Sequence, residues 1–210
     1  IFWFKKPTKI LNKSNPPFYK WFEDGVTNTC YNALDIHIDQ GRGKQPALIY
    51  DSPITGNKKQ FTYAELRSKV SKFAGGLKSQ GVNKGDRVII YMPMIPEAVI
   101  AMLACARIGA IHSVVFGGFA STELASRIDD SKAKVLVTAS CGFEPGRTVE
   151  YKPLVDEAVK LANHKINKMI LFQRAGHEVV LNAPSEISWE EVVSNAKDTD
   201  CVEINSNEFA

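Results

Sequence analysis

The stretch Ala110-Ile111-His112-Ser113-Val114-Val115-Phe116-Gly117-Gly118-Phe119 decides the fold, because an apolar strand runs into a glycine pair and a helical pattern follows at once. A glycine pair allows a tight turn and lets a ligand approach bare N–H groups. The helix predicted over 122–130 can begin there, with its positive dipole end forward. A second strand, predicted over 135–138, leads into the loop Thr138-Ala139-Ser140-Cys141-Gly142-Phe143-Glu144-Pro145-Gly146-Arg147. Both loops leave the carboxyl ends of strands, where open α/β sheets bind ligands, so the stretch predicts a ligand-facing edge.

Strands and helices alternate along the chain on both sides of this stretch. Strands are predicted over 47–50, 60–62, 87–91, 110–115, 135–138, 169–172 and 178–181. Helices are predicted over 31–38, from the cap at 62 onward, and over 96–108, 122–130, 155–162 and 188–196. Strands that alternate with helices imply right-handed βαβ units. The predicted fold class is therefore α/β, with a doubly wound, largely parallel sheet and flanking helices.

Two capping-box patterns mark the starts of helices, Thr62-Tyr63-Ala64-Glu65 and Ser188-Trp189-Glu190-Glu191. After the first, apolar residues recur at helical spacing, which predicts one buried face: Leu66, Val70, Phe73 and Leu77. The helix predicted over 96–108 is apolar all round, which is typical of a helix buried between the sheet and another layer.

The chain divides into two predicted regions. Residues 1–45 are rich in aromatic residues, proline and asparagine and show little periodicity, so we interpret them as an amino-terminal wrapping segment. Residues 46–210 form the predicted α/β portion. No terminating structure is predicted over 205–210, so we expect the chain to be a cut piece of a longer protein.

Composition and charge exclude several classes of partner. A hydrophobic content of 44% in 210 residues is enough to build a buried core. The 26 Lys and Arg against 23 Asp and Glu leave a net charge of only +3, so we expect no nucleic-acid partner. No apolar run reaches the length of a membrane span, so we expect no membrane partner. The four cysteines lie far apart without a C-x-x-C pair, which suggests neither a zinc site nor a disulfide framework and favours a reducing compartment.

The candidate ligand residues each have a plain structural interpretation beside the functional one. Taken alone, Gly117-Gly118 fits a simple strand-to-helix turn as well as a ligand site, and Arg147 fits a solvated surface cation. The stretch Arg42-Gly43-Lys44 lacks the spacing of a phosphate loop. The chain has no G-x-G-x-x-G motif, which disfavours nicotinamide chemistry.

No catalytic constellation or metal site is predicted. The histidines lack the spacing of ligands on one helix face: His37, His112, His164 and His177. Asp129 and Asp130 are adjacent, so they point in different directions on a helix and cannot act as an acid/base pair. Cys141 has no identifiable base beside it, and a nucleophilic thiolate needs one.

Several stretches, in order along nearly the whole chain, carry a resemblance to a known family. They are Lys20-Trp21-Phe22-Glu23-Asp24-Gly25, Tyr31-Asn32-Ala33-Leu34-Asp35, Phe61-Thr62-Tyr63-Ala64-Glu65-Leu66, Lys84-Gly85-Asp86-Arg87-Val88, Tyr91-Met92-Pro93-Met94 and 109–119. On these residues the chain resembles the amino-terminal portion of short-chain acyl-CoA synthetases of the acetyl-CoA and propionyl-CoA synthetase type, within the adenylate-forming superfamily. The tetrad 144–147 followed by 150–154 resembles the propionate-preferring branch more than the acetate one.

The resemblance implies a two-step ligase that uses ATP, Mg²⁺ and CoA. A short-chain carboxylate attacks the α-phosphate of ATP, and the CoA thiol then displaces AMP from the acyl-adenylate. It implies part of the large amino-terminal domain of such an enzyme, and a cytoplasmic or mitochondrial-matrix location.

The resemblance also implies a CoA site. Gly117-Gly118 matches the loop that flanks the pantetheine arm, and the tetrad Glu144-Pro145-Gly146-Arg147 matches the loop that grips the CoA phosphates. Arg147 matches the second arginine of that loop, while Glu144 stands where the first would be. An acid cannot grip phosphate, so that contact is lost or comes from another residue.

The family's ATP phosphate stretch, Thr-Ser-Gly followed by Ser or Thr, Thr-Gly and Pro-Lys-Gly, is absent from these 210 residues. By resemblance we expect it just past Ala210, and we expect the chain alone to be inactive. A free-standing module that binds CoA or a protein partner without chemistry is the alternative. A nucleotide-binding α/β domain of unrelated function rests on fold analogy alone.

Overall fold

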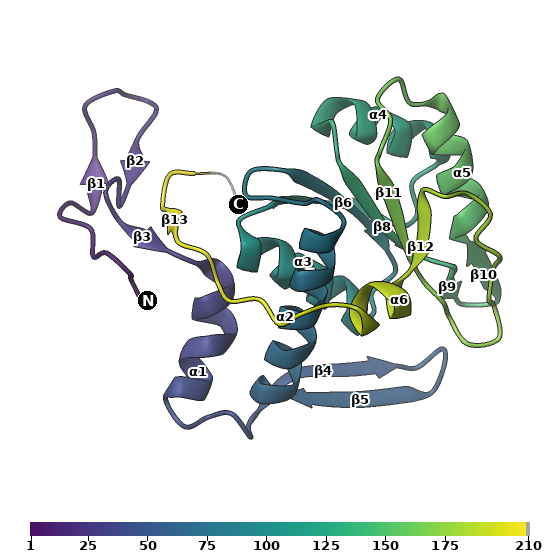
Figure 1. Cartoon of the computed structure of the whole chain (residues 1–210), viewed down its shortest axis with the longest axis horizontal. Helices are drawn as coiled ribbons and strands as arrows, with labels where there is room; N and C mark the ends of the chain where they lie inside the picture. Colours follow the sequence, from purple (N-terminus) through teal and green to yellow (C-terminus); the bar gives the residue numbers. More distant parts are fainter. Residues whose placement is uncertain (209–210) are drawn as a thin grey trace.

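The computed structural model describes residues 1–208, and its centre is a five-stranded parallel sheet in the order β12-β11-β8-β6-β7 (Figure 1). The strands are β6 (Arg87–Met92), β7 (Ile111–Phe116), β8 (Val135–Ala139), β11 (Lys168–Phe172) and β12 (Glu186–Ser188). Because every neighbouring pair in this sheet is parallel, the carboxyl ends of all five strands meet at one edge. The predicted α/β fold class is confirmed.

Helices cover both faces of the sheet (Figure 1). They are α2 (Tyr63–Ser79), α3 (Pro96–Ile108), α4 (Ser121–Ser131), α5 (Tyr151–Leu161) and α6 (Trp189–Ser194). One core lies between the sheet and α2, α3 and α6, and the other lies between the sheet and α4 and α5. Helix α3 packs against both the sheet and α2, as its all-round apolar sequence predicts.

The inner strand β6, between β8 and β7, supplies side chains to both cores. Val88 and Ile90 belong to the core beneath α2 and α3, whereas Ile89 and Tyr91 belong to the core beneath α4 and α5. All four are 0% exposed. This alternation, with apolar residues on both faces, explains why the strand reads as one continuous apolar run.

The hairpin before the sheet and the start of α2 follow the predicted turn and cap chemistry. β4 (Pro46–Ser52) pairs antiparallel with β5 (Asn57–Thr62). The backbone N–H of Glu65 donates to Thr62 Oγ1 at 3.3 Å, and the backbone N–H of Thr62 donates to Glu65 Oε2 at 2.8 Å. The capping box is therefore complete, and the four predicted face residues of α2 are buried. At α6 the cap is confirmed through a Glu191 N–H bond to Ser188 Oγ of 3.1 Å.

The amino-terminal residues pack against the carboxy-terminal end of the described chain. Residues 1–45 hold the short strands β1 (Leu11–Asn12), β2 (Lys20–Trp21) and β3 (Val26–Thr27), the π-helix η1 (Tyr31–Asp35) and the helix α1 (Ile36–Asp39). β13 (Ile204–Asn205) pairs antiparallel with β3 (Figure 1). The prediction of no structure over 205–210 is therefore wrong at Asn205, and residues 209–210 lie outside the described residues. The division at residue 45 stays a prediction.

The loop predicted over 138–147 is in fact a hairpin. β9 (Cys141–Glu144) pairs antiparallel with β10 (Arg147–Glu150), and Gly146 takes a φ of +75° at its turn. The sequence Cys-Gly-Phe-Glu gives only a weak strand signal, because it has four residues and one of them is glycine. Its pairing depends instead on the turn at Pro145-Gly146.

Two other element predictions are wrong or incomplete. The strand predicted over 178–181 does not form, and the outer strand β12 at Glu186–Ser188 takes the place beside β11. The helix predicted from 155 begins at Tyr151, because Pro153 lies in the first turn, where the missing N–H costs no intrahelical hydrogen bond. The structure also brings Cys30 and Cys201 together, although they lie far apart in the sequence. Within residues 1–208, no helix combines the length and apolar character needed to cross a bilayer.

Replacing Thr62 by alanine removes the oxygen that accepts the Glu65 N–H bond. We expect the Thr62→Ala variant to lose about 1 kcal/mol of unfolding free energy, measured by urea denaturation, because the first turn of α2 then leaves one donor without its cap. The Thr62→Ser variant keeps the acceptor and should retain most of the stability. Equal stability of the alanine variant and the parent would contradict the role of the cap.

Candidate functional site

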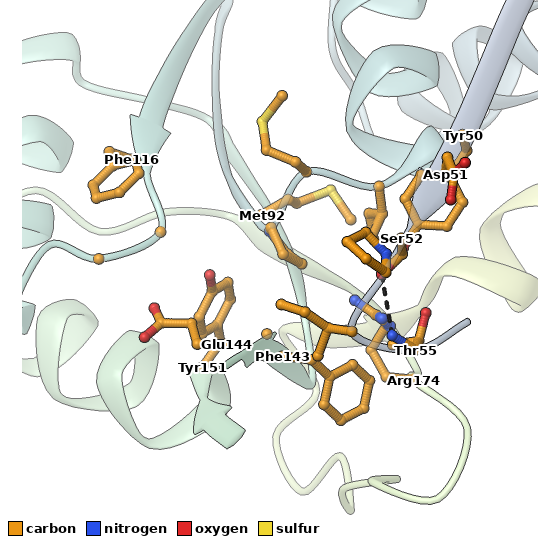
Figure 2. Close-up of a pocket in the computed structure, with 18 of the residues that line it drawn as sticks. Tyr50, Asp51, Ser52, Thr55, Met92, Phe116, Phe143, Glu144, Tyr151 and Arg174 are labelled. Atoms are coloured by element: carbon orange, nitrogen blue, oxygen red, sulfur yellow. Dashed lines mark hydrogen bonds between the residues drawn. The ribbon is translucent and has the colours of Figure 1, made fainter. Parts of the chain in front are cut away.

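A cavity of about 520 Å³ opens at the carboxyl end of the sheet (Figure 2). Its walls come from the β4–β5 turn, the ends of β6 and β7, strand β9, the start of α5 and the residue two positions beyond β11. Most of the lining is apolar or aromatic, and Met92 and Phe116 are among the lining side chains labelled in the close-up. The predicted ligand-facing edge thus coincides with a real cavity of the size of small-molecule sites.

A buried tyrosine of strand β6 holds the glycine loop in place. The Tyr91 hydroxyl donates to the carbonyl oxygens of Gly117, at 3.2 Å, and Phe119, at 2.8 Å. The Phe119 N–H closes the turn by donating to the Phe116 carbonyl at 3.0 Å. Burial raises the pKa of Tyr91, so the hydroxyl stays a donor at neutral pH.

Close packing explains why residue 117 is glycine. A Cβ at Gly117 would collide with the Tyr151 hydroxyl, and a Cβ at Gly142 would lie 2.9 Å from the same oxygen. Tyr151 is itself buried, at 5% exposed, and its ring packs beside that of Tyr91 in a tilted arrangement, with the ring centroids 5.0 Å apart. Two bare backbone segments therefore enclose one phenol, and Gly117 together with the exposed Gly118 faces the cavity.

Tyr151 presents its hydroxyl at the inner end of the cavity. Burial raises the pKa of Tyr151 to about 12, and nearby Tyr91 and Glu144 add to that rise. The phenol is therefore protonated throughout the physiological range and can donate or accept a hydrogen bond without carrying charge. Tyr151 was not singled out from the sequence, because it is the first residue of a helix that was predicted to begin only at residue 155.

The predicted phosphate loop is divided by the structure. Glu144 lines the cavity. Pro145 and Gly146 form the β9–β10 turn and Arg147 begins β10, and these three are not among the described residues that line the cavity. Arg147 is bound to Glu144, with Nε donating to Oε2 at 2.7 Å and Nη2 lying 2.6 Å from the same oxygen. The side chain of Arg147 is 70% exposed, so this ion pair is weak and open to exchange.

A cation that the sequence analysis did not single out lies in the cavity wall. Arg174 follows β11, and its backbone N–H donates to Ser140 Oγ at 2.9 Å. Its guanidinium lies over the Phe143 ring, 4.7 Å from the centroid. Figure 2 shows Arg174 beside the β4–β5 turn at Thr55, while Glu144 and Tyr151 lie nearer the side of Phe116. The rule that ligands bind beyond the carboxyl ends of strands, applied to β11, would have found it.

The start of α4 is not part of the cavity wall among the described residues. Ser121 Oγ donates to Glu157 Oε2 at 2.6 Å, so a carboxylate of α5 lies at this helix end instead of a ligand. The expected contribution of the α4 dipole to a ligand site therefore has no support in the geometry.

The remaining candidates lie apart from one another. His37 packs on Tyr63, and His164 Nε2 lies 2.9 Å from the Ala133 carbonyl oxygen. Asp129 accepts the backbone N–H of His164 at 2.7 Å and so ties the end of α4 to the segment after α5. Cys141 is buried in β9, and burial raises the pKa of its thiol, as for an inert structural cysteine.

Comparison with known proteins gives a consistent picture. Residues 37–205 match the family model described as AMP-binding enzyme, and residues 1–33 match the model described as acetyl-coenzyme A synthetase N-terminus. The chain is 54% identical over 207 residues to the human protein named acyl-CoA synthetase short-chain family member 3, mitochondrial, covering 98% of this chain and 30% of that protein. It is 49% identical over 191 residues to an acetyl-coenzyme A synthetase of Streptomyces coelicolor, covering 91% of this chain and 29% of that protein.

A solved structure shares the fold. Acetoacetyl-CoA synthetase from Streptomyces lividans superposes with a TM-score of 0.86 over 99% of this chain and 31% of that chain, at 24% sequence identity. The chain thus spans about three tenths of the length of the relatives it matches. Because the family model covers most of its residues, the chain belongs to the family of AMP-binding enzymes.

Proposed function

We propose that this chain is the amino-terminal part of an ATP-dependent, AMP-forming short-chain acyl-CoA synthetase that acts on propionate or acetate. The observation that carries the proposal is the cavity at the carboxyl edge of the sheet, where the glycine pair predicted for CoA binding lies beside an apolar wall and a cation. The relatives named as CoA synthetases match over 98% and 91% of the chain, which supports the same assignment.

The residues of the cavity fit a pantetheine arm, which is slender and has amides along an apolar chain. The bare backbone of Gly117 and Gly118 leaves room that side chains would fill, and the Tyr151 hydroxyl offers one neutral hydrogen bond. When bound, CoA supplies the thiol that accepts the acyl group from its adenylate. The chain's own part is to hold and orient that arm and to exclude water from it.

The proposed phosphate contact combines two arginines. Arg147 lies at an exposed turn, where its weak pairing with Glu144 can exchange for a phosphate. Arg174 lies in the cavity wall with its guanidinium fixed against Phe143, so it offers a positioned fork of donors. We propose that Arg174 compensates for the acid at position 144.

The remaining parts of the proposed activity need residues outside this chain. ATP and Mg²⁺ are proposed as substrates of the longer protein, since the family's phosphate stretch is absent from these 210 residues. The proposed compartment is the cytoplasm or the mitochondrial matrix, and one relative carries the name of a mitochondrial protein. The alternative is a free-standing module that binds CoA or a protein partner without chemistry.

Mass and activity of the native protein separate these alternatives. An antibody to this segment should capture a protein about three times larger than the 23.2 kDa chain, given its share of the relatives' length. That protein should release pyrophosphate from ATP when propionate or acetate, Mg²⁺ and CoA are present, whereas the 210-residue chain should release none. A native mass near 23.2 kDa would favour the binding module. Carboxylate-dependent release by the chain itself would contradict the placement of the ATP site outside it.

The substitution Gly117→Ala tests the close packing in the cavity. Because its Cβ would collide with the buried Tyr151 hydroxyl, we expect a loss of about 1–3 kcal/mol of stability and weaker binding of both CoA and free pantetheine, measured by calorimetry. The matched control is Gly43→Ala, where the nearest atom to a new Cβ is 3.7 Å away, and it should change neither. If both alanine variants bind pantetheine like the parent, the glycine loop does not flank the arm.

The substitution Arg174→Gln tests the proposed compensating cation. Loss of a charged hydrogen bond costs about 1.5–3 kcal/mol, so we expect CoA affinity to fall by about tenfold or more, with pantetheine affinity unchanged. Arg147→Gln should have a smaller effect, because its side chain is exposed and already paired. An equal loss for CoA and pantetheine would indicate that Arg174 acts on the shape of the cavity and not on phosphate.

A further inference from the structure

A buried cluster far from the cavity surrounds the side chain of Arg107, at the carboxy-terminal end of α3. Its Nη1 lies 2.8 Å from Asp35 Oδ2, and its Nη2 lies 3.0 Å from Asp35 Oδ1, so the ion pair is bidentate. The two side chains are 3% and 10% exposed. The Nε donates to the Thr199 carbonyl at 2.5 Å, which ties the carboxy-terminal segment to the same guanidinium.

Two cysteines complete this cluster. Arg107 Nη1 lies 3.1 Å from Cys201 Sγ and 3.5 Å from Cys30 Sγ. The two sulfurs lie within 4.8 Å of one another, although their residues are 171 positions apart in the chain. A hydrogen bond from the Cys201 thiol and the charge of Arg107 lower the pKa of Cys30, and the thiolate so favoured raises the pKa of Cys201. The cysteine pair therefore loses its first proton readily, whereas loss of the second proton is strongly disfavoured.

The cluster is not built for a metal ion. Cys30, Cys201 and Asp35 are a plausible ligand set by residue type, yet the Arg107 guanidinium already lies among their ligand atoms. A divalent cation would have to displace a buried guanidinium that makes two bonds to the same carboxylate, which removes a compensated buried ion pair. Two neighbouring sulfurs beside a fixed cation instead match the surroundings of reactive thiols.

We propose that Cys30 and Cys201 are a redox-active dithiol, which a hydroperoxide converts to an intramolecular disulfide. Cys201 is the sulfur that a small oxidant can reach, since it is half-buried whereas Cys30 is 0% exposed. Cys201 packs against the core beneath α2 and α3, and its own segment, residues 196–203, forms neither helix nor strand.

The chemistry balances with the hydroperoxide as the only oxidant. Proton transfer within the S–H···S contact places the thiolate on Cys201 and the proton on Cys30. The Cys201 thiolate attacks the peroxide; an S–O bond forms, the O–O bond breaks, and the departing alkoxide takes the Cys30 proton and leaves as the alcohol. The Cys30 thiolate then attacks the sulfenic sulfur; an S–S bond forms, the S–O bond breaks, and the departing hydroxide takes a proton from solvent and leaves as water. Two thiols are oxidised by two electrons in total, and the hydroperoxide is reduced to one alcohol and one water.

The disulfide would join the amino-terminal segment to the carboxy-terminal segment at the point where they already meet. Asn28 Nδ2 donates to the carbonyl oxygens of Ala106 and Val202, each at 2.9 Å, so these three segments are in contact before oxidation. The Arg107–Asp35 pair can stay intact, because neither of its bonds uses a thiol proton. A crosslink that closes so long a loop restricts the unfolded chain and stabilises the folded one.

The test is to expose the native protein to hydrogen peroxide, alkylate it after unfolding, and measure its intact mass and its linked peptides. Within these 210 residues we expect two of the four thiols to escape alkylation, with a loss of two hydrogens and a linked peptide pair that contains Cys30 and Cys201. The midpoint of thermal unfolding should rise by several degrees, and dithiothreitol should reverse both changes.

Matched variants keep the test decisive. Cys201→Ser, at the half-buried position, should abolish the crosslink and the thermal shift, whereas Cys105→Ala, in the apolar core beneath α3, should retain both. Four alkylated thiols after peroxide, or a crosslink between other cysteines or between two molecules, would overturn the proposal. So would stoichiometric Zn²⁺ binding that protects both cysteines from peroxide and is lost in Cys201→Ser, because the pair would then be a metal site.

Discussion

The structure depends on burial of the inner strand β6, which lies between β8 and β7, from both sides. Its alternate residues enter two separate cores, so the sheet can exist only with helices on each face. The same strand carries Tyr91, whose hydroxyl reaches over the end of the sheet to hold the glycine loop. The shape of the cavity therefore depends on how the core packs around Tyr91. A substitution in either core that moves the Tyr91 side chain would also move the glycine loop, because the Tyr91 hydroxyl is bonded to it.

The parts of the fold that depend on local sequence were predictable. The long apolar strand β6, the all-round apolar helix α3 and the capped helix α2 each carry a period or a cap within one short stretch, and each forms where expected. The outer strand β12 has only three residues, Glu186–Ser188, and pairs on one side alone, so it leaves no apolar run to detect. The β9–β10 hairpin was missed for a similar reason, since its register comes from a turn and not from hydrophobic alternation.

The position of the candidate site was predictable from the sequence, but the identity of the arginine that lines it was not. The rule about carboxyl ends of parallel strands located the edge, and the resemblance located the glycine pair that lines the cavity. Which cation faces inward could not be read from the chain, because Arg147 and Arg174 each follow a strand in a polar loop. Their surroundings differ only in the folded structure: Arg147 is exposed and paired with Glu144, whereas Arg174 lies over the ring of Phe143.

The contact between the two ends of the described chain has a consequence for how the protein folds during synthesis. Asn28 and Val202 are 174 positions apart, and Phe22 and Ser206 are 184 apart, yet each pair shares a hydrogen bond. The partners of the amino-terminal segment are thus made long after it, while the hairpin, α2 and the inner strands of the sheet have local neighbours from the start. A ribosome-bound chain would hold Asp35 and Arg107 without the backbone of Thr199 that caps them. The amino-terminal segment should then dock late, in one step with the emergence of residues 199–206, and long-range closure of this kind is the slow part of folding.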